Sequence, residues 1–525
     1  MKLREIFRNA QYRSLMLAFL YLLVIFTVNA LCQEKVRYFY AVCLSFAFML
    51  PVFIFPKQIK LYFMLLLVFV YVPVWANACH MLLYKTGFTS ASFRAIFMTN
   101  PGELVEFCNT FADYRLWLFT FALFGFAVFA IRKVRPVNKL SPVFVKNMQR
   151  VCLLFLVFTI LKGFYTFHDY KNQLVSLKVR DELDLFQDEV ENARRLRLLI
   201  GAYDFANIRS IFPADREQTY VVVIGESASR EHMQIYGYGR PTSPLLSREK
   251  DLLLFDNVVS PHANTTESLR KALSFTHFGN DELAAAKGSV VDYFNAAGFK
   301  TFWISNQNEA GPWDDLVAVW AKAAAYNKFI NRTHWRNLDA PFDEKLVPYI
   351  AQALQDKAKR KIIFVHLMGA HANYAKRFPK EFAKFSGQGE RQESLAAYDN
   401  AMLYNDYVIS QILALLKQEK KISYLLYFSD HAEDVRDADD SCHCHSEPIA
   451  TPQMFRVPFV LWLSPEYKAA REAYAAALKT RTGRYYNTEH LIHSLADLSG
   501  LLNFDIEYQN SIFSDKYKQP VIRQQ

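Results

Sequence analysis

Residues 220–227 read Tyr-Val-Val-Val-Ile-Gly-Glu-Ser, an apolar run that ends in a glycine and two polar residues. Its four consecutive β-branched residues favour a strand, and the absence of alternation favours burial on both faces of a sheet. Comparable apolar runs recur at residues 301–304, 362–367, 424–428 and 457–463, with helical patterns between them. This alternation predicts an α/β domain over residues 216–525, with a mostly parallel sheet between helices.

Polar residues follow each of the first four predicted strands. They are Gly225-Glu226-Ser227, Ser305-Asn306-Gln307, Gly369-Ala370-His371 and Ser429-Asp430-His431. Ligands bind beyond the carboxyl ends of the strands in such sheets, so we expect these groups to converge there. Carboxylate oxygens and imidazole nitrogens together suit zinc or manganese. Each group alone also fits a solvated turn or a helix cap, but their repetition after every strand favours a metal site.

A hydroxyl group for nucleophilic attack is present in Asn264-Thr265-Thr266-Glu267-Ser268, which opens a predicted helix. The same residues fit an ordinary helix cap with a capping-box glutamate. A hydroxyl at a helix N-terminus also lies where phosphate oxygens bind well, and a bound divalent ion lowers its pKa. The residues alone leave both interpretations open.

The first third of the chain is apolar and basic. The chain has 525 residues and a formal charge of +10, but residues 1–168 hold 18 Lys and Arg against five Asp and Glu, whereas the remainder holds 43 against 46. The slightly acidic remainder argues against a nucleic-acid partner. Five apolar stretches predict a transmembrane domain of five helices within residues 1–168. They are residues 14–33, 38–56, 61–84, 116–131 and 151–168.

The orientation of this domain follows from the basic residues in its loops, because Lys and Arg favour the cytoplasmic side. With the N-terminus inside, the inner loops hold twelve Lys and Arg and the outer loops hold five. Five crossings then place the remainder outside the cytoplasm, beginning with a charged amphipathic bridging helix and linker at residues 169–215. An outer interfacial loop, at about residues 79–115, contains short amphipathic helices and both Cys79 and Cys108. These cysteines either pair there or stay apart, with Cys79 inside the third helix.

The segment from Gly225-Glu226-Ser227 through Tyr236-Gly-Tyr-Gly-Arg-Pro-Thr-Ser-Pro244, preceded by five apolar stretches and followed later by Ser429-Asp430-His431, resembles the phosphoethanolamine transferases. These are membrane-anchored members of the alkaline-phosphatase/sulfatase superfamily. The resemblance covers nearly the whole chain and implies a sulfatase-like fold for the C-terminal domain.

The resemblance also implies roles for individual residues. Glu226, Asp430 and His431 would bind one or two zinc ions, with manganese the less favoured metal. Thr265 would be both the nucleophile and a metal ligand, with Thr266 as the competing assignment. His371 and His445 (or the nearby His443) would contact the phosphate and act in catalysis, by protonating a leaving oxygen or stabilising the phosphoryl group. Thr99 and Glu103 would contact the lipid headgroup. Asn306 is a further expected substrate contact, from its place after a predicted strand. Ala95 stands where the family usually has an asparagine, which weakens the headgroup assignment.

The implied reaction moves phosphoethanolamine from phosphatidylethanolamine onto the enzyme threonine and then onto an acceptor hydroxyl. We expect a monomeric protein of the bacterial inner membrane, with its N-terminus in the cytoplasm and its catalytic domain in the periplasm. Lipid A relatives usually carry a Cys-Gly-Thr motif and several disulfides. Here Ala263-Asn-Thr-Thr266 and only two cysteines after residue 168, Cys442 and Cys444, favour a glycan acceptor, with lipopolysaccharide inner core preferred.

Three alternatives compete with this interpretation. Lipoteichoic-acid synthase has five helices and a threonine nucleophile but uses phosphatidylglycerol and manganese, and the Tyr-Gly-Tyr-Gly-Arg-Pro element disfavours it. A sulfatase or phosphodiesterase-like hydrolase is the second; the sulfatase pattern needs Cys or Ser followed by Pro and Arg, which Thr265 lacks. A non-catalytic membrane scaffold is the third, and the presence of all four expected ligands disfavours it.

Overall fold

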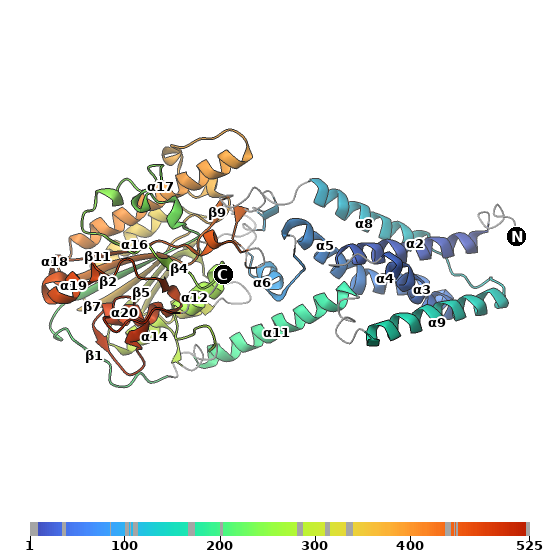
Figure 1. The fold of residues 1–525 in the computed structure, drawn as a ribbon, viewed down its shortest axis with the longest axis horizontal. Coiled ribbons are helices and arrows are strands. Elements are labelled where there is room, and N and C mark those ends of the chain that lie inside the picture. The colour runs from blue at the N-terminus through green and yellow to red at the C-terminus, as the bar shows by residue number, and fades with distance from the viewer. Residues whose placement is uncertain are drawn as a thin grey trace. The chain divides into compact units, whose positions relative to one another are not determined.

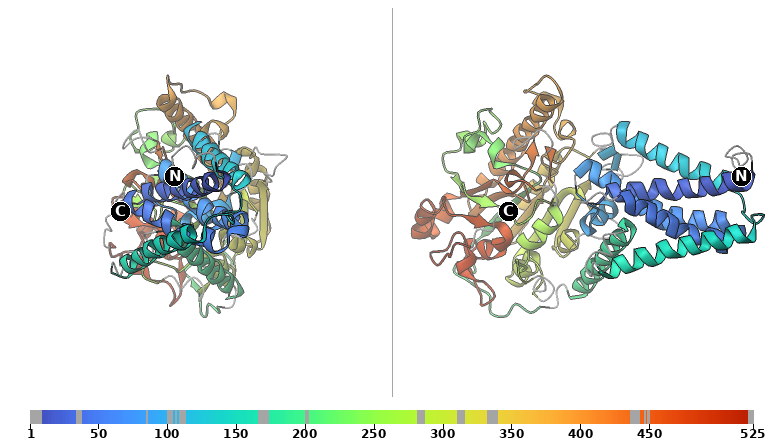
Figure 2. Two further views of the ribbon diagram at one scale, coloured as in Figure 1. Left: turned by 90° about the vertical axis from the view of Figure 1, so that its right-hand side faces the viewer. Right: turned by 45° about the vertical axis from the view of Figure 1, so that its right-hand side comes forward.

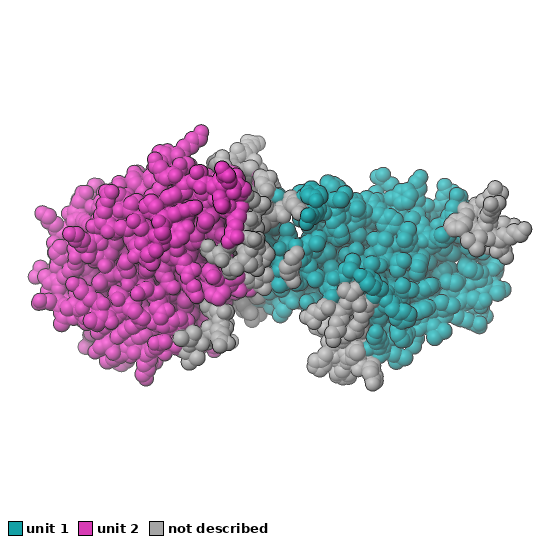
Figure 3. All heavy atoms as spheres, turned by 45° about the horizontal axis from the view of Figure 1, so that its top comes forward, with its two compact units in different colours: residues 1–97, 107–189 teal, residues 98–106, 190–525 magenta. Residues whose placement is uncertain are grey.

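The structure is a computed structural model. It describes residues 9–33, 38–84, 86–99, 104–105, 107–108, 114–165, 174–199, 203–280, 287–309, 316–331, 340–435, 443–445, 447 and 450–520. The chain forms two compact units, residues 1–97 with 107–189 and residues 98–106 with 190–525 (Figure 3). Each unit is described by itself.

The first unit contains the apolar helices, which lie side by side (Figure 2). Within the described residues, four helical stretches are long and apolar enough to cross a membrane: Ala10–Leu31, Pro56–Tyr84, Tyr114–Lys133 and Pro142–Lys162. The helix α3 (Tyr38–Ile54) has 17 residues, close to the lower limit of about 17 for a span. Each predicted apolar stretch is therefore mainly helical over its described residues, the last three residues of the fifth stretch lying outside them. The number of five membrane crossings stays a prediction.

These helices overlap the predicted ranges, but several begin earlier than predicted, α9 by the most. They are α2 (Ala10–Leu31), α3, α4 (Ile59–Leu66), the π-helical segment η2 (Leu67–Tyr71), α5 (Val72–Tyr84), α8 (Tyr114–Lys133) and α9 (Pro142–Tyr165). The prediction that the last helix starts at residue 151 is wrong by nine residues. The charges of Lys146 and Arg150 suggested a loop, but both side chains are exposed in the first turns of α9, and Pro142 is well suited to a helix start.

Two amphipathic helices in the predicted interfacial and bridging regions are also present. They are α6 (Ser90–Met98) and α11 (Val175–Leu199). The backbone N–H of Ser90 donates to Glu182 Oε2 on α11 at 2.9 Å, and the rings of Phe97 and Phe186 stack with centroids 5.3 Å apart. Cys79 and Cys108 are both free cysteines, so the pairing considered for them is not formed.

The second unit is built on a seven-stranded sheet with the order β3-β11-β8-β2-β7-β5-β6. The strands are β2 (Gln218–Gly225), β3 (Leu253–Leu254), β5 (Lys300–Asn308), β6 (Tyr326–Asn331), β7 (Arg360–His366), β8 (Ile422–Ser429) and β11 (Phe459–Leu463). The five strands from β8 to β6 are mutually parallel. The mostly parallel sheet is confirmed, but β11 pairs antiparallel with β8, a direction that the apolar pattern alone does not encode.

Helices cover both faces of this sheet (Figures 1 and 2). One face packs against α12 (Thr265–Ala272), α14 (Val290–Ala296), α15 (Leu316–Lys322) and α20 (Leu491–Leu498), and the other against α16 (Val347–Leu354) and α17 (Glu390–Lys417). Side chains of β2 alternate between the two cores, with Val222 and Ile224 in the first and Val221 and Val223 in the second. The unbroken apolar run of β2 is therefore explained, as predicted, by burial on both faces of the sheet.

Candidate active site

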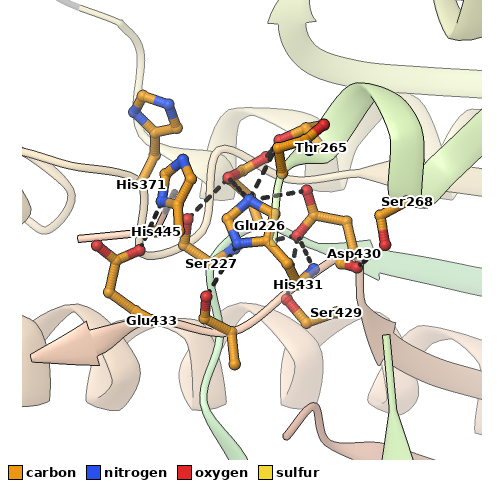
Figure 4. Close-up of polar contacts among 12 residues, drawn as sticks. Glu226, Ser227, Thr265, Ser268, His371, Ser429, Asp430, His431, Glu433 and His445 are labelled. Atoms are coloured by element: carbon orange, nitrogen blue, oxygen red, sulfur yellow. Dashed lines mark hydrogen bonds and ion pairs between the residues drawn. The ribbon is translucent and has the colours of Figure 1, made fainter. Parts of the chain in front are cut away.

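The two central strands, β2 and β8, bring the first site residues together. Gly225 pairs with Ser429 at their carboxyl ends, so Glu226 and Asp430 emerge side by side. His431 Nε2 lies 3.3 Å from Glu226 Oε1 and 3.5 Å from Asp430 Oδ2. All three side chains are buried, and one ligand atom from each lies within 4.8 Å of the others (Figure 4). The convergence expected from the strand ends is present for these residues.

The loop after β2 is fixed in an uncommon conformation. Ser227 has a φ of 57°, a left-handed value that costs energy for a residue other than glycine. Its N–H donates to Asp430 Oδ1 at 3.1 Å and its hydroxyl donates to Glu226 Oε1 at 2.8 Å. The Tyr398 hydroxyl, from α17, donates to the Ser227 carbonyl and accepts from the Ser229 N–H. Surrounding hydrogen bonds thus hold the Glu226 carboxylate in place.

Thr265 reaches the same cluster from α12. It is the first residue of this helix, and the Asn264 side chain caps the helix by accepting from the Glu267 N–H. Thr265 Oγ1 donates to Glu226 Oε2 at 3.0 Å and lies 3.3 Å from His431 Nε2. The cap residue is therefore Asn264 and not a serine or threonine, as the cap interpretation expected, and the hydroxyl that meets the carboxylates is that of Thr265.

The electrostatics of the cluster favour a bound cation. Burial raises the pKa of Glu226, but the hydrogen bond and charge of His431 outweigh burial and hold that pKa well below its usual range. Burial and the Glu226 carboxylate raise the pKa of Asp430 to about 8. Burial lowers the pKa of His431, but the two carboxylates outweigh it and raise that pKa to about 10. These buried groups therefore favour a cation, because a bound metal ion replaces protons that the cluster otherwise holds.

The donor atoms of the cluster also fit zinc. His431 Nδ1 lies 2.9 Å from the Ala432 carbonyl and donates to it, so Nε2 faces the carboxylates, where a bound metal ion would displace its proton. Asp430 Oδ2 is buried and has no hydrogen-bond partner among the described residues. Two carboxylates, an imidazole and a hydroxyl form a hard and borderline donor set that zinc accepts.

A second group of side chains adjoins the cluster (Figure 4). His445 Nδ1 lies 2.9 Å from Glu433 Oε2, and Tyr374 donates to the other carboxylate oxygen at 2.7 Å. The ring of His445 lies 4.1 Å from that of His431 and 6.1 Å from that of His371, measured between centroids. Burial lowers the pKa of His371 to about 4, so its imidazole is neutral at pH 7.

Glu433 was missed by the sequence interpretation. It lies two residues after His431 and is fully buried, and ligand atoms of Glu433, His431 and His445 lie within 4.8 Å of one another. Burial raises the pKa of this carboxyl, but the adjacent His445 outweighs burial and lowers it. The sequence did offer a signal, because Glu433 comes three residues after Asp430, beyond the end of the same predicted strand. A carboxylate so close to the predicted site is expected to be buried, and a buried carboxylate needs a partner.

The other residues predicted to contact substrate are Asn306, Thr99, Glu103 and His443. Asn306 is fully buried, and its Nδ2 donates to Asp343 Oδ1 at 2.8 Å. Asp343 in turn accepts from the backbone N–H groups of Met368 and Gly369, in the turn that leads to His371. Thr99 directly follows α6 and belongs to the second unit. Glu103 lies outside the described residues, as does the side chain of His443.

Gly369 lies against the backbone of Glu226, and we expect Gly369→Ala to disturb the site. Its φ is +55°, and a Cβ there would lie 2.6 Å from the Glu226 carbonyl oxygen. The left-handed conformation alone costs alanine about 1–2 kcal/mol, and the clash must also move Glu226. We expect a lower unfolding midpoint of the full chain in detergent together with reduced zinc content.

Gly298→Ala is the matched control for this prediction. Gly298 has a φ of +80°, and no atom of the described residues lies within 4 Å of the place that a Cβ would take. It shares the conformational cost without the contact, so its zinc content should remain that of the original chain. Equal zinc content in both variants would contradict a role for Gly369 in placing Glu226.

The Tyr-Gly-Tyr-Gly-Arg element has a structural role close to the site. His232 Nδ1, the Tyr238 hydroxyl and Arg240 Nη1 lie 2.9, 2.9 and 2.7 Å from the carboxylate of Asp399 on α17. Asp399 is fully buried, and Tyr398 beside it holds the Ser227 loop. The element therefore anchors the loop after β2 to α17.

Comparisons with known proteins agree with this arrangement. Residues 218–501 match the Sulfatase family. Phosphoethanolamine transferase EptC of Escherichia coli K12 is 28% identical over 509 residues, which cover 90% of this chain and 86% of that protein. The crystal structure of the C-terminal periplasmic domain of Escherichia coli EptC in complex with Zn is 31% identical, covers 61% of this chain and 92% of that one, and has a TM-score of 0.57. The integral membrane lipooligosaccharide phosphoethanolamine transferase A of Neisseria meningitidis is 20% identical, covers 96% and 97% of the two chains with a TM-score of 0.69, and shares the fold.

Proposed function

Since the chain belongs to the sulfatase family and, within it, to the phosphoethanolamine transferases, we propose that it transfers phosphoethanolamine from phosphatidylethanolamine to a hydroxyl group of lipopolysaccharide inner core. The observation that carries this proposal is the placement of the Thr265 hydroxyl, 3.0 Å from Glu226 and 3.3 Å from His431. A nucleophile beside a buried anionic metal site is what phosphoryl transfer through an enzyme-bound intermediate requires.

We propose that Glu226, Thr265, Asp430 and His431 hold zinc. The unpartnered Asp430 Oδ2, the Nε2 of His431 and the zinc complex of the Escherichia coli EptC domain support this assignment. Bound zinc lowers the pKa of a hydroxyl ligand and offsets negative charge on a phosphate. One zinc ion would use all four ligands. Metal analysis of the purified protein would show whether a second ion binds near Glu433 and His445.

In the first step, the Thr265 hydroxyl gives up its proton along its hydrogen bond to Glu226, and Oγ1 attacks the phosphorus of the lipid. The bond from phosphorus to the diacylglycerol oxygen breaks, and that oxygen takes up a proton as diacylglycerol leaves. Phosphoethanolamine is then esterified to Thr265. Glu226 accepts the hydrogen bond of the Thr265 hydroxyl, which orients one oxygen lone pair for attack and reduces the cost of positioning.

In the second step, an acceptor hydroxyl attacks the same phosphorus and the bond to Thr265 Oγ1 breaks. The acceptor loses its proton, and Thr265 recovers one. His371 and His445 lie beside the cluster and are the candidates for contacting the phosphate oxygens and for moving these protons. Glu433 holds the imidazole of His445 through its Nδ1, which fixes the direction of the other ring nitrogen.

The membrane helices give this chemistry its location. We propose that the N-terminus is cytoplasmic and the catalytic unit periplasmic, in the inner membrane of a bacterium, supported by the distribution of basic residues and by the periplasmic domain of the related EptC. Thr99 and Glu103 remain the proposed headgroup contacts. Tethering to the bilayer raises the effective concentration of a lipid donor.

The test uses the full chain in lipid nanodiscs with phosphatidylethanolamine labelled in its ethanolamine. Core oligosaccharide, lipid A and a no-acceptor control are compared by mass spectrometry. Labelled phosphoethanolamine on the core oligosaccharide is the expected result. Label on lipid A alone would overturn the proposed acceptor, and release of free phosphoethanolamine with every acceptor would overturn transfer in favour of hydrolysis.

A further inference from the structure

Glu447 contacts three consecutive residues that directly precede Thr265. Its Oε1 lies 2.9 Å from His262 Nδ1, accepts from the Ala263 N–H at 2.8 Å and accepts from Asn264 Nδ2 at 3.1 Å. The residues involved are more than 180 positions apart in the chain. A carboxylate oxygen that accepts three hydrogen bonds fixes its donors in both direction and distance.

Asn264 transmits this constraint to the nucleophile. Its Nδ2 donates to Glu447, while its Oδ1 accepts from the Glu267 N–H at 3.0 Å as the cap of α12. The amide group is therefore held at both ends, and neither atom can move without losing a hydrogen bond. Thr265 is the next residue and the first of the helix, so the cap sets where its hydroxyl points.

The other end of the same short segment is attached to the metal site. His445 lies two positions before Glu447, and its Nδ1 is 2.9 Å from the buried carboxylate of Glu433. Glu433 in turn closely follows Asp430 and His431 in the sequence. The segment thus meets the end of β8 through His445 and the start of α12 through Glu447. Among the described contacts of Glu447, none is with a residue of the proposed zinc site.

We propose that Glu447 is a positioning residue that holds the loop before α12 so that Thr265 Oγ1 stays aligned with Glu226 and His431. The proposal rests on the function proposed above, because alignment matters only if Thr265 is the nucleophile. Glu447 touches neither Thr265 nor the cluster in its described contacts, so its effect passes through Asn264 and His262. An alignment error of about 1 Å is enough to lower a rate about 100-fold.

Glu447→Ala and Glu447→Gln test this role in the full chain. Alanine removes the acceptor, whereas glutamine keeps an amide oxygen that accepts the same hydrogen bonds. With fluorescent phosphatidylethanolamine as donor, we expect Glu447→Ala to lower kcat about 10–100-fold, with KM and zinc content unchanged. Glu447→Gln should recover most of the rate. Exchange of the Ala263 and Glu267 amide hydrogens should quicken in the alanine variant and not in the glutamine variant.

Glu249→Ala is the matched control. Glu249 is 33% exposed and pairs with Lys417, while Glu447 is 34% exposed and pairs with His262, so the control loses a comparable ion pair elsewhere. Its kcat should stay within about twofold of the original chain. A Glu447→Ala kcat equally close to that value would overturn the proposal. So would loss of rate, zinc and stability to the same extent in both Glu447 variants, which indicates a purely structural role.

The hydrogen-exchange arm separates this inference from the proposed function. If the original chain transfers no phosphoethanolamine, the proposed function fails, and faster exchange at Ala263 and Glu267 in Glu447→Ala still supports the constraint on the loop. If transfer is present and exchange is unchanged in Glu447→Ala, the constraint is absent and the inference about Glu447 fails alone.

Discussion

Thr265→Ala should lower the transfer of phosphoethanolamine by at least about 10³-fold, because it removes the atom that forms the bond to phosphorus. The fold should remain, since Thr265 is only partly buried and alanine suits a helix. The measurement is the rate of label transfer from phosphatidylethanolamine by the full chain, with unfolding midpoint and zinc content determined on the same preparations. Loss of one zinc ligand should weaken metal binding, so assays need saturating zinc.

Thr266→Ala distinguishes the two threonines of the motif. Thr265 Oγ1 is the hydroxyl that donates to Glu226, so Thr266→Ala should keep most of the rate. The reverse pattern, with activity lost only in Thr266→Ala, would assign the nucleophile to Thr266. Trapping the intermediate gives an independent readout, since mass spectrometry of the chain mixed with donor alone should find phosphoethanolamine on the peptide that contains Thr265.

Asp430→Asn should lower zinc affinity and transfer by at least about 100-fold. Loss of a residue that only orients a metal ligand typically costs 10–100-fold in affinity, and Asp430 would contact the metal directly. The amide has one oxygen, and Ser227 N–H and His431 N–H already donate to Oδ1 of the carboxylate. The other position would then become an NH₂ group beside Glu226 and His431, where it cannot bind a cation.

Chelation gives the same prediction without a substitution. Treatment of the full chain with a zinc chelator should abolish transfer, and added zinc should restore it in the original chain but only at much higher concentration in Asp430→Asn. Asp356→Asn is a suitable control, because Asp356 pairs with Lys300 at 2.6 Å away from the cluster. Unchanged transfer after removal of bound metal would refute the proposed role of zinc.

The centre of the site could be predicted because its chemistry follows directly from strand ends. Glu226, Asp430 and His431 each come within two residues of the end of β2 or β8, and both strands contain an apolar run long enough to identify them. Adjacent parallel strands then bring them together regardless of their separation in the chain. Thr265 is different, because its residues alone left a helix cap and a nucleophile both open, and the family resemblance selected it over Thr266. The structure has Thr265 as the first residue of α12, after the cap residue Asn264.

Other parts of the site depend on pairings that no local pattern encodes. Asn306 was expected just after a strand, as Glu226 is, but it lies inside β5, where its amide is buried against Asp343 and supports the turn before His371. The roles of Glu433 and Glu447 depend on their partners His445 and His262, which lie on other segments of the chain. No local sequence pattern identifies these pairs. The edge strand β6 was missed because Tyr326-Asn-Lys-Phe-Ile-Asn331 is half polar, as edge strands often are.

The central position of β2 in the sheet has a consequence for how the molecule matures. The hydrogen bond from Ser227 to Asp430 joins residues 203 positions apart, and β7 and β8, which flank β2, are both made long after it. During translation, Glu226 is therefore synthesised well before the residues that surround it in the folded site. Metal capture must come late in folding, and fragments that end before residue 430 should be metal-free. Premature termination would thus yield protein in which the site around Glu226 is incomplete.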